Sequence, residues 1–172
     1  MASLVENLVE TLEGENTEYQ KLLELSRSKT QIIVNGDLER LQKVTDDEQL
    51  IVDKINNLEK QRIQIMKNVA KILNTDVEGL KLETLISLLG KAPKDQKALS
   101  LIHDKLKITL HEMKTINERN AVLLNSAIEM VEFDLSLIQA MKKAPETANY
   151  NKGAYNTGSV LLSSSGNFDA KQ

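Results

Sequence analysis

Residues that break helices are rare along this chain: two prolines and seven glycines are spread over 172 residues. Sandwiches, barrels and doubly wound sheets need turn residues at each change of direction, so the composition disfavours them. The apolar residues instead recur every three or four positions, which is the spacing of one helix face. Only two phenylalanines, three tyrosines and no tryptophan are present. Long helices can pack through aliphatic side chains alone, and we therefore expect an all-α fold.

The clearest helix boundary lies at Asn35-Gly36-Asp37. Gly36 suits the left-handed residue that ends a helix, and Asp37 suits the cap that begins the next one. A connection this short makes the two helices antiparallel neighbours. The second helix then carries an apolar repeat of alternating threes and fours from residue 41 to residue 72. This repeat predicts coiled-coil packing.

Glu48 and Arg62 interrupt that apolar repeat. Polar residues within an apolar seam often set the register of the helices that pack there. Counted across the turn, Arg62 should pair with Glu10. Glu48 should likewise pair with Arg27. We therefore expect the two residues to fix the helix register, and direct contact with a partner protein is the alternative.

The second half of the chain predicts one more long helix. The spacing is irregular between residues 74 and 93, where a short helix is expected at 82–90. Nothing then interrupts a third long helix from Pro93 to Lys143. We expect an elongated antiparallel helical bundle or coiled coil of three long helices plus one short helix over residues 1–144. Residues 145–172 are rich in Gly, Ser and Asn, and are expected to form a flexible polar tail.

The composition also excludes several functional classes. The absence of cysteine excludes disulfides, thiolate metal sites and cysteine nucleophiles. A net charge of −3 offers no basic surface for nucleic acid, and no apolar run approaches the ~20 residues needed for membrane insertion. His103 and His111 lie eight residues apart on one helix, too far to share a metal ion. We expect a cytoplasmic protein that is not an enzyme and uses no cofactor or metal.

Six short motifs follow one another along the chain. They are Tyr19-x-x-Leu22-Leu23, the Asn-Gly-Asp turn at 35–37, Glu48-x-x-Ile51 with Leu58-Glu59-x-x-Arg62, Leu82-x-x-Leu85, Asn117-Glu118-Arg119-Asn120-x-x-Leu123-Leu124-Asn125-Ser126-Ala127, and Tyr150-Asn151-Lys152-Gly153. In their order and spacing they resemble the FlgN-type flagellar export chaperones over almost the whole chain. The Ser-rich extension after Gly153 departs from that pattern.

The resemblance implies a cytoplasmic chaperone of flagellar type III protein export. Such chaperones bind the C-terminal helical segments of hook-associated proteins and prevent their premature assembly. They deliver these clients to the flagellar export gate and its ATPase components.

The third long helix is the expected place of client binding, because its apolar residues cover more than one narrow stripe between residues 120 and 141. The candidates are Asn120, Leu123, Leu124, Ala127, Ile128, Val131, Leu135 and Ile138. Packing on the first two helices is the alternative role for these residues. In the tail, Tyr150 and Tyr155 are candidates for contact with a client or the export gate, since tyrosine joins an apolar ring to a polar tip.

Two other functions remain as alternatives. A structural or adaptor coiled coil would form a homo-oligomer through its long seams and carry no client. A histidine phosphotransfer bundle would use His111, but the glycine that usually follows such a histidine is replaced here by Met113-Lys114.

Overall fold

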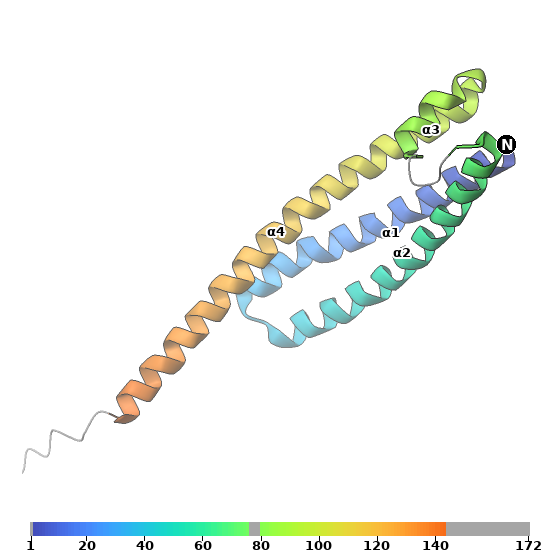
Figure 1. The fold of residues 1–172 in the computed structure, drawn as a ribbon. Helices are drawn as coiled ribbons and strands as arrows, with labels where there is room; N and C mark the ends of the chain where they lie inside the picture. The colour runs from blue at the N-terminus through green and yellow to red at the C-terminus, as the bar shows by residue number, and fades with distance from the viewer. Residues whose placement is uncertain (1, 76–79, 144–172) are drawn as a thin grey trace, which may run out of the picture. The chain divides into compact units, whose positions relative to one another are not determined.

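The computed structural model describes residues 2–75 and 80–143, which are almost entirely helical (Figure 1). In chain order the elements are α1 (Ala2–Asn35), α2 (Leu38–Leu73), α3 (Leu82–Leu88), a short 3₁₀ turn η1 (Leu89–Lys91) and α4 (Pro93–Lys143). The all-α fold with three long helices and one short helix is confirmed. The tail expected at 145–172, with Tyr150 and Tyr155, lies outside the described residues.

The chain divides into two units, the first running from Met1 to Glu132 and the second beginning at Phe133. The first unit holds α1, α2, α3 and α4 as far as residue 132. Among the described residues, the second unit holds the remainder of α4, residues 133–143. The packing of helices set out below is that of the first unit.

A glycine turn joins α1 to α2 and reverses the chain. Gly36 has a φ of +64°. Its N–H donates to the carbonyl of Ile33 at 3.0 Å, and the N–H of Asp37 donates to the carbonyl of Ile32 at 3.2 Å. This pair of bonds closes a helix at a left-handed residue. Asp37 then caps α2, because its Oδ1 accepts a hydrogen bond from the N–H of Arg40 at 3.0 Å. The turn predicted from the sequence is confirmed.

The left-handed conformation of Gly36 leads to a stability prediction. Gly36→Ala should lower the free energy of unfolding by about 1–2 kcal/mol, because a Cβ in this conformation crowds the following carbonyl. Gly90→Ala is the matched control and should change it by less than about 0.5 kcal/mol. An added Cβ meets no atom within 4 Å at either position, so neither variant creates a clash. Chemical denaturation compares the two, and equal stabilities would contradict the role given to Gly36.

α4 runs in the same direction as α1, whereas α2 runs antiparallel to both (Figure 1). Two side-chain hydrogen bonds fix the direction of α4. Thr109 bonds to Asn16, and Asn120 bonds to Thr30, so the residue numbers rise together along the two helices. The tight turn at Gly36 reverses the chain between α1 and α2. The connection that includes α3 reverses it again between α2 and α4.

The hydrophobic core lies at one end of the first unit, where the start of α1, the end of α2, α3 and the start of α4 meet. Its buried residues are Val5, Leu8, Leu12, Val69, Ala70, Leu80, Leu85, Leu89, Leu99 and Ile102. Leu85 of α3 and Leu99 of α4 have no exposed surface. The short helix, whose packing the sequence left open, therefore packs against this core. All ten side chains are aliphatic, in keeping with the aromatic-poor composition.

Candidate functional site

Beyond the core, polar residues meet between the helices in what we call the inner polar layer: Glu15, Asn16, Arg62 and Thr109. The Nε of Arg62 lies 3.0 Å from Oε1 of Glu15, and its Nη2 lies 3.2 Å from Oε1 of Glu59. The side chain of Glu15 is 4% exposed, that of Arg62 34%. The hydroxyl of Thr109 donates to Oδ1 of Asn16 at 2.9 Å. A carboxylate from α1 is thus buried against a guanidinium from α2.

The burial of Glu15 disturbs its ionisation. Loss of hydration raises the pKa of Glu15 above its ordinary value of 4.5, while the charge and hydrogen bond of Arg62 act in the opposite direction. Burial also raises the pKa of Tyr19, and the nearby Glu15 and Glu59 carboxylates add to that rise. The inner polar layer therefore holds a charge that is costly to bury and that depends on Arg62 for compensation.

The sequence predicted a different partner for Arg62. It binds Glu15, not Glu10, which lies on the exposed face of α1. Counting residues across a turn gives the distance along the helix axis, but not the face on which a side chain lies. The expected pair with Glu10 is wrong for this reason.

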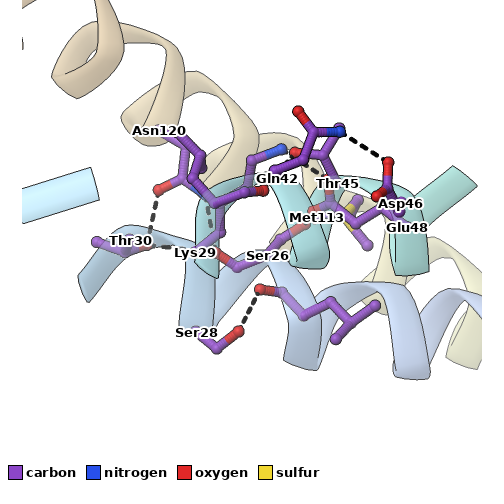
Figure 2. A network of polar contacts seen from close by, with 12 residues as sticks. Ser26, Ser28, Lys29, Thr30, Gln42, Thr45, Asp46, Glu48, Met113 and Asn120 are labelled. Atoms are coloured by element: carbon purple, nitrogen blue, oxygen red, sulfur yellow. Dashed lines mark hydrogen bonds and ion pairs between the residues drawn. The ribbon is translucent and has the colours of Figure 1, made fainter. Parts of the chain in front are cut away.

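A second group of polar residues, the outer polar layer, lies further toward the turn: Ser26, Lys29, Thr30, Glu48 and Asn120 (Figure 2). Glu48 accepts hydrogen bonds from the Nζ of Lys29 at 2.6 Å and the hydroxyl of Ser26 at 3.1 Å. Asn120 donates to the carbonyl of Ser26 at 2.8 Å, and its Oδ1 accepts from the hydroxyl of Thr30 at 2.7 Å. Both functional groups of this buried amide are therefore used.

The expected pairing of Glu48 with Arg27 is also wrong, since Lys29 takes that place. Arg27 lies on an exposed face of α1, where its Nη2 lies 2.9 Å from Oε2 of Glu112 on α4. Arg27 and Lys29 are two residues apart, and a step of two residues along a helix rotates the side chain by about 200°. That rotation is enough for one side chain to face α4 while the other faces α2.

At the turn end of the first unit, an open groove of about 340 Å³ lies between α1, α2 and α4. We call it the turn groove. It is lined by Ile32, Ile33, Gly36, Asp37, Leu38, Leu41, Leu124, Ala127, Ile128, Val131 and Glu132. Leu38, Ile128 and Val131 are 77%, 54% and 57% exposed. A concave and mostly apolar surface that stays open to solvent is typical of a binding site.

The candidate residues of the third long helix fall into different settings. Four of them line the turn groove: Leu124, Ala127, Ile128 and Val131. Leu123 is half-buried, and Asn120 is buried within the outer polar layer. Leu135 and Ile138 are 53% and 48% exposed, and they belong to the second unit. Tyr150 and Tyr155 lie outside the described residues.

Sequence reasoning missed the opposite wall of the groove, which Ile32, Ile33, Leu38 and Leu41 form. The signal was present, because these apolar residues flank the turn at Gly36 on both sides. These residues could be recognised as a groove wall only once it was known that α4 runs parallel to α1. That direction brings Leu124 to the end of the first unit where the turn lies.

Neither histidine belongs to the groove. His103 is half-buried, with Nδ1 3.2 Å from Asp104 and Nε2 3.8 Å from Glu83, and His111 is exposed. Across residues 2–75 and 80–143, no three His, Cys, Asp or Glu side chains are grouped so as to hold a metal ion. No helix in this described part is both long and apolar enough to span a membrane.

A known protein family matches the part of the chain that contains all four helices. A family model described as FlgN protein matches residues 1–157. No curated protein and no solved structure matches the chain. Both polar layers and the turn groove lie inside the matched stretch.

Proposed function

Because the chain belongs to the FlgN family of flagellar export chaperones, we propose that its turn groove binds the C-terminal helical segments of hook-associated proteins. We call such a segment the client. The family is one of chaperones and not of enzymes. The single observation that carries the proposal is the open apolar groove at the end of the bundle opposite the core.

The spacing on α4 supports a helical client. Leu124, Ile128 and Val131 of the groove are four and three residues apart, and Leu135 and Ile138 continue the same spacing along α4. A repeat of fours and threes presents the knobs and holes into which one face of another helix packs. An amphipathic client helix in the groove would bury its apolar face against Leu124, Ile128 and Val131 and against α1 and α2.

The chemistry required of such a chaperone is the covering of an apolar stripe. A client helix that is destined for a filament exposes that stripe until it assembles, and exposed stripes cause premature association. Binding in the turn groove removes the stripe from solvent without any covalent step. The clients could then leave by simple dissociation at the export apparatus.

We place this activity in the cytoplasm, with delivery of the client to the export gate and its ATPase components. Tyr150 and Tyr155 are the proposed contacts of the tail with the gate or the client. Glu48 and Arg62 are proposed to hold the register of α1 and α2, which sets the position of the groove wall around the turn.

The test is complex formation between the full chain and the C-terminal segment of a hook-associated protein. We expect a soluble complex with one client per chain in size-exclusion chromatography and calorimetry. The matched control is the same segment with two residues of its apolar stripe replaced by aspartate, which should not bind. Equal binding of both segments would contradict recognition of the apolar stripe. Binding of neither segment would contradict the proposed function and favour a coiled-coil adaptor.

A further inference from the structure

α4 carries a second exposed apolar row that the turn groove does not use. We call it the back stripe: Met130, Phe133, Leu137 and Met141, with exposed fractions of 67%, 65%, 49% and 70%. At 100° per residue, Met130 lies about 100° around α4 from Val131 of the turn groove. One client helix in the groove therefore leaves the back stripe uncovered.

An exposed apolar row at helical spacing is costly in water and is typical of a helix-packing surface. The four residues are three, four and four positions apart on the single continuous helix α4. Each is one of the larger apolar side chains, and Phe133 is an exposed aromatic ring. Large flexible methionines around an aromatic anchor are common in protein interfaces.

We propose that the back stripe pairs, antiparallel, with the back stripe of a second copy of this chain. A two-fold axis that passes between Phe133 and Leu137 brings the stripe of one copy against the stripe of the other. In that register Phe133 faces Leu137 of the second copy, and Met130 faces Met141 of the second copy. Each contact is then repeated by the two-fold axis, as a closed dimer requires.

The charges beside the stripe support the same register. Glu129 and Lys143 lie on the same flank of the stripe, at opposite ends of it. In the antiparallel pair, Glu129 comes opposite Lys143 of the second copy, and the axis generates this ion pair twice. Two flanking ion pairs select the antiparallel orientation, because a parallel pair would place like charges together.

One residue opposes the pairing. Asp134 lies on the other flank near the two-fold axis, so the two copies of its carboxylate come close to each other. With four apolar residues per copy and this repulsion, the dimer should be reversible and of micromolar affinity. None of the four residues of the back stripe lines the turn groove, so the dimer uses no residue of the client site.

The test is sedimentation velocity of the full chain over about 1–200 µM, a range chosen to bracket a micromolar dimer. We expect a shift from monomer to dimer with rising concentration. Lys143→Glu should weaken the dimer about tenfold through charge repulsion. Adding Glu129→Lys to that variant should restore the affinity to within about threefold. Lys142→Glu is the matched control, because its neighbouring position points toward the groove side, and it should leave the dimer unchanged.

Leu137→Asp should abolish the dimer while leaving the helical fold intact, since Leu137 is half exposed and lies on a helix surface. Circular dichroism checks the fold. A chain that stays monomeric throughout, or a dimer that Leu137→Asp does not disturb, would overturn the proposal. Loss of the dimer with Val131→Asp instead would assign self-association to the turn groove, and would overturn it too. Leu137→Asp should bind the client like the original chain, so this outcome is separate from that of the proposed function.

Discussion

Val131→Asp should weaken client binding by at least about 100-fold, because it places an unpaired carboxylate inside an apolar contact. Val131 lines the turn groove and is 57% exposed in the free chain. The added carboxylate is therefore hydrated in the free chain and loses that hydration when the client covers it. Titration of a fluorescently labelled client, followed by anisotropy, measures the affinity directly. The thermal midpoint of the free chain should change little, since no buried contact is lost.

Met130→Asp is the matched control for this prediction. Met130 is the next residue along α4 and is 67% exposed, but it belongs to the back stripe. We expect the client affinity of Met130→Asp to stay within about threefold of that of the unmodified chain. A tenfold loss would correspond to about 1.4 kcal/mol of binding free energy. Equal losses in the two variants would mean that any acid on α4 disturbs binding. No loss in either would mean that the client binds elsewhere.

Arg62→Ala should lower the free energy of unfolding by about 2–3 kcal/mol, because it leaves the carboxylate of Glu15 buried without its partner. The figure is below that of a fully buried ion pair, since the Arg62 side chain is one-third exposed. Glu59→Ala is the control. It removes the other carboxylate that binds Arg62, but Glu59 is exposed, and the cost should stay below about 1 kcal/mol.

The effect of Arg62→Ala should also depend on pH. The pKa of Glu15 is already raised by burial, and loss of Arg62 would raise it further. A carboxyl group with a raised pKa in the folded state contributes stability that is present below its unfolded pKa and is lost as the pH rises through the folded value. The variant should thus lose more stability at neutral pH than near pH 4.5, the ordinary pKa. A loss of the same size at both values would contradict the role given to Arg62.

The helix boundaries could be predicted because they depend on local chemistry. Gly36 adopts a left-handed conformation and Asp37 caps the next helix, as these residue types favour in any chain. The third long helix begins at Pro93 and ends at Lys143, as its uninterrupted pattern predicted. At the end of α2, Asn74 takes the left-handed place that glycine takes at the end of α1.

The partners of the polar seam residues could not be predicted in the same way. Glu48 and Arg62 were recognised as interruptions of an apolar repeat, but their partners depend on the rotation of α1 relative to α2. That rotation is set by contacts far apart in the sequence, such as those of Glu15 and Lys29. The role of Asn120 depends on the same information, because its amide is buried only where α4 packs against α1.

One wall of the turn groove contains residues that the sequence had already singled out, and the other wall does not. The α4 row of Leu124, Ile128 and Val131 follows from an excess of apolar residues beyond one stripe. The facing wall of the groove needed the direction of α4, which no local signal specifies. The structure adds a division of the first unit into an apolar core at one end, two polar layers and an open apolar groove at the turn.

The most direct test of the account is cross-linking from inside the groove. The chain has no cysteine, so Ala127→Cys carries a single thiol for a photoreactive group in the groove wall. Asn125→Cys, two residues away on an exposed face of α4, is the control. With the client bound and the complex illuminated, we expect the client to be cross-linked from position 127 and not from position 125. Cross-linking from 125 alone, or equally from both, would contradict client binding in the turn groove.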